Sequence, residues 1–61
     1  MREEEIRSYI QQIQDKYYTP TAKIAKAIGV DSSLVNKFIH QKIEPSDRLL
    51  KLLEAWVSER I

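Results

Sequence analysis

Apolar residues recur at helical spacing along this chain, and the residues that break helices fall only between the apolar runs. The chain has one glycine and two prolines, which are Pro20, Gly29 and Pro45. Isoleucines follow one another three or four residues apart before the first proline, and leucines do so after the last. This period matches one face of an α-helix. The pattern therefore predicts an all-α protein, a small bundle of four helices with five as the alternative.

The first expected helix carries a narrow apolar stripe of Ile6, Ile10, Ile13 and Tyr17. It ends at the sequence YYTP, because the residue before a proline avoids the helical conformation. A short second helix follows, with Thr19 as its N-cap and Pro20 in its first turn. Gly29 suits the left-handed conformation that ends such a helix. The residues expected to face inward are Ile24, Ala25 and Ile28.

The third expected helix is capped by Asp31 or Ser32 and has two opposed faces at 100° per residue. Its apolar face consists of Leu34, Val35, Phe38 and Ile39. Its polar face consists of Ser32, Ser33, Asn36, Lys37 and His40. The sequence KIEPSD then forms a loop, and Ser46 or Asp47 caps a fourth helix over about residues 46–60.

The chain is too short to bury a large core, which limits how it gains stability. With 61 residues it forms one domain, 1–61, and buries only about 60% of the surface that its unfolded chain exposes. No cysteine is present, so neither disulfides nor a Cys/His zinc site adds stability. Closely packed helices, a partner subunit, or both must supply it.

Charge is unevenly distributed, although the net charge is only +1. Residues 1–15 sum to −2, residues 16–51 to +4 and residues 52–61 to −1. The basic middle suits an anionic partner, but it also suits an ordinary solvated surface. The acidic start, MREEEIRSY, lacks the apolar core of a signal peptide, and no apolar run approaches the roughly 20 residues that span a bilayer. A cytoplasmic protein with no membrane partner is expected.

Two short helices joined by a tight turn with a glycine, over about residues 20–41, form a helix-turn-helix. Ala25 is small because the third expected helix crosses the second close to this position. Together with Gly29, Val30 and Val35 it resembles the helix-turn-helix of the lambda-repressor-like family, also called the Cro/C1 or Xre type. The segment KIEPSDRLLKLLEAW resembles the loop ending in Pro-Ser and the leucine-rich fourth helix of that family. The resemblance covers nearly the whole chain, and it implies a small helical fold that binds DNA.

Two positions depart from the family pattern. His40-Gln41 stands where many members carry Asn-Gly, which predicts a different cap at the end of the third helix. Thr21 stands where many members carry a glutamine that touches DNA and supports its neighbours. A long C-terminal extension is lacking, so a ligand-sensing or cleavable domain is not expected.

The resemblance places DNA contacts on the polar face of the third helix. Asparagine pairs with adenine, serine reaches base edges or phosphate, and lysine reaches guanine or phosphate. At the start of the second helix, phosphate is expected to meet side chains and helix N-terminal amides. The candidate DNA-binding residues are Thr21, Lys23, Ser32, Ser33, Asn36, Lys37 and His40. A plain solvated surface remains the alternative for each.

The sequence does not predict catalysis or metal binding. The only histidine, His40, has no partner at metal or catalytic spacing. No catalytic dyad, glycine-rich phosphate loop or metal site is present in the sequence. Neither an enzyme nor a cofactor is therefore predicted.

The fourth helix carries more apolar residues than one core needs. One arc, of Leu49, Leu52, Leu53 and Trp56, serves the core of a single chain. Three further apolar residues widen this arc sideways to about half the helix. The predicted homodimer seam consists of Leu50, Leu53, Val57 and Ile61. The alternative is one or two partly exposed leucines, which are common in monomers.

The expected function is that of a sequence-specific regulator of transcription that binds double-stranded DNA, as a repressor rather than an activator. It would act as a homodimer on a pseudo-palindromic operator. Two alternatives remain. One is an antitoxin-like regulator that also binds a protein partner, and the other is a helical protein-interaction module without DNA binding.

Overall fold

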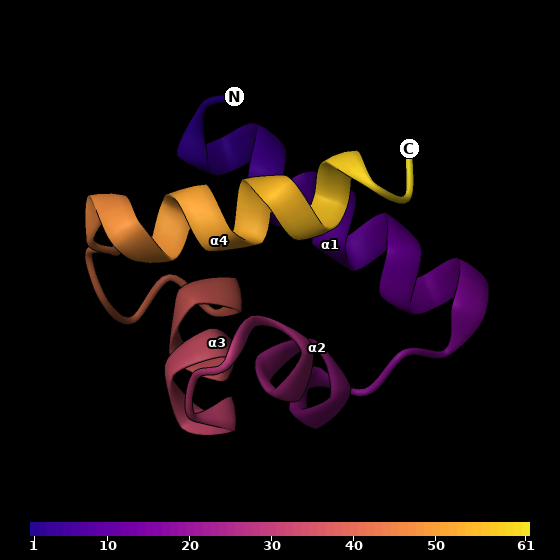
Figure 1. Ribbon diagram of the computed structural model, residues 1–61, viewed down its shortest axis with the longest axis horizontal. Helices are drawn as coiled ribbons and strands as arrows, with labels where there is room; N and C mark the ends of the chain where they lie inside the picture. The colour runs from indigo at the N-terminus through magenta and orange to yellow at the C-terminus, as the bar shows by residue number, and fades with distance from the viewer.

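The computed structural model describes all 61 residues and contains four α-helices and no β-strand. The helices are α1, Glu3–Tyr17; α2, Thr21–Ile28; α3, Ser32–Ile39; and α4, Asp47–Ser58 (Figure 1). The all-α prediction with four helices is confirmed, and no fifth helix forms. None of the helices has both the length and the apolar composition needed to cross a membrane.

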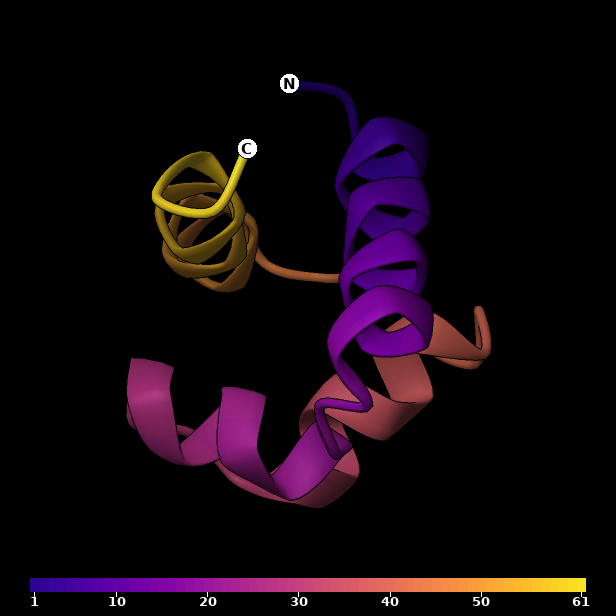
Figure 2. The ribbon, with the colours of Figure 1, turned by 90° about the vertical axis from the view of Figure 1, so that its right-hand side faces the viewer.

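Two pairs of helices enclose a single core. α1 and α4 form the upper part of the molecule in Figures 1 and 2, and α2 and α3 lie together below them. α2 packs mainly on α3, and α4 packs mainly on α1. Every helix contributes one apolar face. The core residues are Ile6, Ile10, Ile13, Ile24, Ala25, Val35, Phe38, Ile39, Leu49, Leu53, Trp56 and Val57.

The apolar stripe of α1 is one turn shorter than predicted. Ile6, Ile10 and Ile13 are buried, but Tyr17 is 59% exposed. The chain leaves the helix at Tyr18, which has a left-handed φ of 55°. The last turn of α1 therefore projects past the core, and Tyr17 is a surface residue rather than part of the buried stripe.

Side-chain caps begin α3 and α4. The Asp31 carboxylate accepts a hydrogen bond from the N–H of Ser33 at 3.1 Å. The Ser46 hydroxyl accepts one from the N–H of Leu49 at 3.2 Å. Each bond satisfies one of the N–H groups that a helix leaves free in its first turn. The sequence offered two candidates for each cap, and the structure uses the first of each pair.

α2 and α3 both end in a left-handed residue, one a glycine and the other not. Gly29 has a φ of 78° and Gln41 a φ of 60°. At the end of α3, the N–H of Lys42 donates to the Lys37 carbonyl at 2.8 Å, and the N–H of Gln41 donates to the Phe38 carbonyl at 3.2 Å. These two bonds define a Schellman motif, whose left-handed position is usually glycine. α3 thus ends in backbone geometry that favours glycine, although a glutamine occupies the position.

Gln41→Gly should raise the free energy of unfolding by about 1 kcal/mol, because glycine adopts positive φ without a Cβ clash. The converse change, Gly29→Ala, should lower it by about 1 kcal/mol through backbone strain. A Cβ at Gly29 meets no neighbouring atom, so overpacking does not contribute. Urea unfolding measures both changes. A neutral or destabilising Gln41→Gly would contradict the strain assigned to position 41.

A buried arginine joins α1 to the end of α3. Arg7 is only 9% exposed. Its Nε donates to the Phe38 carbonyl oxygen at 3.0 Å, and its guanidinium lies 4.8 Å from the centre of the Phe38 ring. Its Nη2 lies 3.4 Å from the Glu3 carboxylate, one turn earlier in α1. The arginine therefore fixes both the backbone and the side chain of Phe38, a buried residue in the last turn of α3.

Arg7→Ala should lower the free energy of unfolding by roughly 2–4 kcal/mol, because it removes a charged hydrogen bond and leaves a gap in the core. Arg7→Met keeps the apolar stem and should lose less, which separates packing from hydrogen bonding. Arg2→Ala, at an exposed arginine of the same helix start, is the control and should change little. Equal stability of the Arg7→Ala and Arg2→Ala variants would refute the stabilising role of the Arg7–Phe38 contact.

Candidate nucleic-acid interface

All residues predicted for the polar face of α3 are exposed: Ser32, Ser33, Asn36, Lys37 and His40. The opposite face is buried, since Val35 and Phe38 are fully inaccessible and Ile39 is 8% exposed. Leu34, on the border of the two faces, is half-buried. α3 therefore has the two opposed faces that its sequence predicts.

α3 is held on two sides, so its exposed face has a fixed orientation. α2 packs against it, and Ala25 of α2 lies in the core that the two helices share, 1% exposed. Arg7 of α1 binds its last turn through Phe38. A helix held by packing at one side and by a charged hydrogen bond at its end presents its outer side chains as one rigid unit.

One acidic side chain lies at the N-terminal end of this face. The Asp31 carboxylate caps α3 through the N–H of Ser33. Its negative charge stands beside Ser32 and Ser33 and repels phosphate there. At this end of α3 the serine hydroxyls therefore suit base edges better than phosphates.

The N-terminus of α2 lacks the capping found at α3 and α4. Pro20, with φ −71° and ψ 151°, is the N-cap, and no side chain accepts a hydrogen bond from the backbone N–H groups of the first turn. Thr19 lies outside the helix, so the predicted Thr19 cap is wrong, and Pro20 precedes the first turn instead of lying within it. The extended backbone of Pro20 delays the helix by one residue. No acidic residue lies in the first turn.

The two candidate phosphate residues of α2 differ in exposure. Lys23 is exposed, whereas Thr21 is half-buried. The Thr21 hydroxyl accepts a hydrogen bond from Nε2 of Gln14, in α1, at 3.2 Å. The amide of Gln14 thus sits next to the start of α2 and orients Thr21. Lys23 remains free to reach an anion.

Basic residues outnumber acidic ones on α2, on α3 and in the segments that flank them. Between residues 19 and 43 the chain has four lysines, all exposed, and one acidic residue, Asp31. The lysines are Lys23, Lys26, Lys37 and Lys42. This distribution gives the α2–α3 side of the molecule a positive field that attracts polyanions.

His40 ends α3 and is exposed. Its N–H donates to the Asn36 carbonyl at 3.0 Å, within the last turn. No group of three or more histidine and acidic side chains is placed to hold a metal ion. His40 therefore lies on the polar face of α3 and is not part of a metal-binding group of side chains.

The predicted dimer seam on α4 is not an exposed surface. Leu53 and Val57 are 0% exposed and lie in the core, and Leu50 is half-buried against it. α1 covers this flank of α4, where the amino group of Met1 lies 3.1 Å from the Glu54 carboxylate. The seam prediction is therefore wrong for Leu53 and Val57, because the packing partner of that flank is α1 of the same chain.

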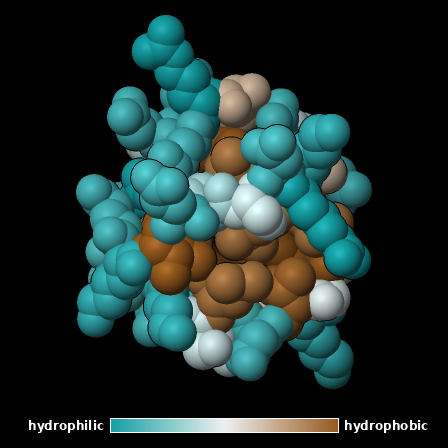
Figure 3. All heavy atoms as spheres, turned by 90° about the vertical axis from the view of Figure 1, so that its left-hand side faces the viewer, coloured by the Kyte–Doolittle hydropathy of each residue, from teal (hydrophilic) through white to brown (hydrophobic).

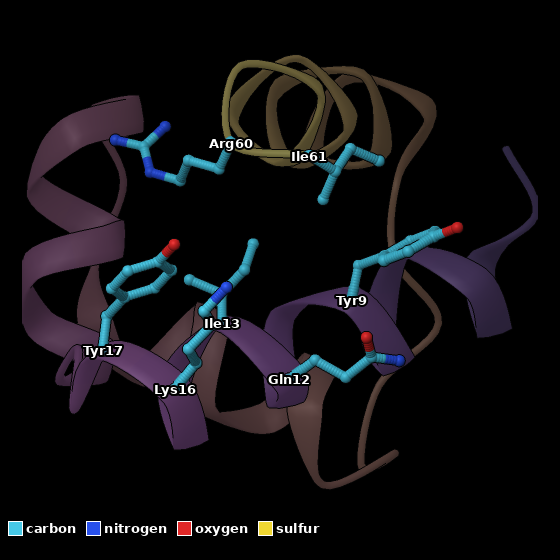
Figure 4. Close-up of a pocket in the computed structure, with 7 residues that line it drawn as sticks. All are labelled: Tyr9, Gln12, Ile13, Lys16, Tyr17, Arg60 and Ile61. Atoms are coloured by element: carbon cyan, nitrogen blue, oxygen red, sulfur yellow. The ribbon is translucent and has the colours of Figure 1, made fainter.

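Ile61 is the one exposed member of the predicted seam, at 62%. It follows α4 and, with Arg60, faces Tyr9, Ile13 and Tyr17 of α1 across an open hollow (Figure 4). The side chains in this hollow come from α1 and from the end of the chain. Ile61 thus continues the α1–α4 contact rather than an outer face of α4.

Val57→Glu should unfold the protein, because an unpaired charge in the core costs roughly 4 kcal/mol or more. Leu50→Glu should cost about 1–2 kcal/mol, since its side chain stays partly in water. Circular dichroism during thermal unfolding separates the two variants. A Val57→Glu protein as stable as wild type would place Val57 at the surface after all.

Two residues that shape this interface were not predicted from the sequence. Arg7 fixes the end of α3, and Gln14 orients Thr21. Arg7 carries a weak sequence signal, because it directly follows the buried Ile6 and so lies at the edge of the apolar stripe. Gln14 carries no such signal, because a polar residue beside an apolar stripe is ordinary.

Comparisons with protein-family models, with curated proteins and with solved structures find no match to this chain.

Proposed function

We propose that this protein binds double-stranded DNA in a sequence-specific manner and regulates transcription as a homodimer on a pseudo-palindromic operator. The observation that carries the proposal is the exposed polar face of α3 on a helix whose other face is buried. The pair α2 and α3 then acts as a helix-turn-helix of the lambda-repressor-like type. An α-helix of this kind fits the major groove of B-DNA.

Within this proposal, α3 enters the major groove and reads base edges. Asn36 lies near the middle of the exposed face, where its amide can donate to N7 and accept from N6–H of one adenine. Ser32 and Ser33 reach neighbouring bases at the end of α3 where Asp31 disfavours phosphate. Lys37 reaches guanine or the adjacent backbone.

The phosphate backbone meets α2 and the residues around the end of α3. The uncapped N-terminus of α2 offers N–H groups to a phosphate oxygen, and no acidic side chain opposes the anion there. Lys23 adds a charge, and Thr21 adds a hydroxyl oriented by Gln14. His40 supplies a contact at the opposite end of α3. These contacts position the protein and carry no sequence information themselves.

Regulation follows from occupancy and needs no chemistry. A dimer that covers a promoter excludes polymerase, so repression is the expected effect. Two copies of α3 would meet successive major grooves about 34 Å apart. Each copy alone buries little surface and neutralises few phosphates, so a single half-site should bind weakly.

Selection from random DNA followed by titration of the selected site tests the assignment of the α3 face. Asn36→Ala should cost roughly 1–3 kcal/mol and relax the choice at one base position. Lys37→Ala should weaken binding with a smaller effect on specificity. Gln11→Ala and Lys16→Ala, at exposed positions of α1, are the matched controls. Wild-type affinity in both α3 variants would show that this face does not bind DNA.

Salt dependence separates DNA binding from a protein-interaction role. Affinity for DNA should fall steeply with salt, and Lys23→Ala should lower the slope of log K against log salt by about 1. An apolar protein interface responds little to salt. Binding to the selected DNA that does not change between low and high salt would argue against the proposed contacts.

A further inference from the structure

One flank of α4 stays uncovered, on the side opposite to the predicted seam. Two adjoining hollows run along it and share Leu52. The first hollow lies between the start of α4 and the α2–α3 turn, and Figure 3 shows a hydrophobic area on this side of the molecule. The residues that line this hollow are Gly29, Val30, Leu34, Ser46, Arg48, Leu49 and Leu52. The second is lined by Ala27, Ile28, Leu52, Ala55, Trp56 and Glu59. Along these hollows α4 keeps apolar surface that no other element of the chain covers.

Four of the residues that line one hollow or the other, three in α4 and one at its C-cap, form one straight stripe. Arg48, Leu52, Ala55 and Glu59 recur at i, i+4, i+7 and i+11, so they lie on a single line along the helix. We call these four residues the side stripe. It is basic at one end, acidic at the other and apolar in the middle.

The charged ends of the side stripe are available to a partner. The Arg48 side chain makes no ion pair or hydrogen bond within the chain. The Glu59 side chain is 76% exposed, and its only charged neighbour is the adjacent Arg60, at 3.5 Å. An exposed pair of this kind contributes little to stability. Both ends can therefore exchange water for an opposite charge.

We propose that the occupant of this surface is a second copy of the same chain. The side stripe is self-complementary. If two α4 helices pack antiparallel about a two-fold axis midway between Leu52 and Ala55, Arg48 of each copy faces Glu59 of the other. The same axis sets Leu52 against the small side chain of Ala55. A two-fold interface requires this kind of self-matching patch.

The hollows beside the side stripe supply the rest of the interface. Ile28, Val30 and Leu34 are half-buried in the single chain and would lose their remaining exposure. A stable interface needs roughly 600 Å² from each partner, against a total surface of 4340 Å² for this chain. The dimer therefore involves the turn between α2 and α3 as well as α4.

One feature of the proposed dimer has a meaning only if the proposed function holds: both α3 faces lie on the same side of the dimer, where both could meet one DNA duplex. α2 and α3 lie on the same side of α4 in Figures 1 and 2. A two-fold axis perpendicular to α4, directed toward that side, leaves both α3 helices at one end of the dimer. The existence of the dimer itself does not depend on DNA.

Sedimentation of the full chain without DNA, over a range of concentrations, tests the interface. Arg48→Glu sets two acidic pairs across the axis, and Glu59→Arg sets two basic pairs. Each single variant should dimerise about tenfold more weakly or worse. The double variant, Arg48→Glu with Glu59→Arg, should dimerise like wild type. An equimolar mixture of the two single variants should form a heterodimer, because both of its pairs are then opposite in charge.

Matched controls have the same charge changes on the exposed part of α1: Lys16→Glu and Glu4→Arg. They should leave dimerisation unchanged. Ala55→Glu, at a position exposed in the single chain, should abolish the dimer while circular dichroism still reports a folded helical protein. The inference is overturned if wild type sediments as a monomer at every concentration, or if the single variants associate as wild type does.

Failure of this inference and failure of the proposed function are distinguishable. If the dimer responds to the charge exchange but binds no selected DNA, the proposed interface is supported and the proposed function is contradicted. If the wild-type protein is a monomer and binds the selected DNA through Asn36, the proposed function is supported and the proposed interface is contradicted. Operator titration with the Arg48→Glu variant links the two, because it should lose affinity for the full site while keeping its base preference.

Discussion

The contact between Arg7 and Phe38 connects the one long helix of the N-terminal half to the helix that carries the candidate interface. A buried guanidinium is costly unless every side is satisfied. Here the carbonyl at 3.0 Å, the aromatic face at 4.8 Å and the Glu3 carboxylate at 3.4 Å provide that environment. The Phe38 side chain is fully buried in the core, so the same residue anchors α3 by its backbone and by its side chain. In a core of only twelve residues, a charged link of this kind replaces the additional apolar layer that a larger domain would have.

The ends of α2 and α3 determine how the candidate interface is presented. Gly29 turns the chain through a left-handed residue without steric cost, and the Asp31 cap starts α3 two residues later. Gln41 performs the same turn with a side chain present and so stores strain. The strain lies directly after His40, at the end of the polar face. The start of α3, by contrast, combines a side-chain cap with a glycine turn and carries no such strain.

α4 illustrates how one amphipathic helix serves two surfaces. The flank with Leu53 and Val57 faces α1, and the flank with Leu52 and Ala55 borders an open hollow beside α2. The apolar surplus in the sequence of α4 is real, but most of it is buried inside the chain. The part left at the surface, around Leu52 and Ala55, is small and is flanked by opposite charges. This combination favours a symmetric pairing of limited strength, and a weak dimer of this kind would be strengthened when both copies share one DNA site.

The sequence by itself determined the helices, their order and most of their ends. Three helix-breaking residues stand between apolar runs, and no residue pattern competes with the helical period. The sequence also determined which residues of α3 face outward, because a helix fixed on one face leaves its opposite face exposed. It did not determine the Thr19 cap or the exposure of Tyr17, which depend on where the chain turns between α1 and α2.

Only the tertiary structure decided which flank of α4 is free. Periodicity gives the angle of each side chain about its own helix axis, but not the side on which a neighbouring helix packs. α1 packs over Val57 and Leu53, and that choice moved the open surface to Leu52 and Ala55. Tertiary packing also brought Arg7 to Phe38 and Gln14 to Thr21, 31 and 7 residues away along the chain. Contacts between helices depend on the relative placement of whole helices, which no local pattern of residues specifies.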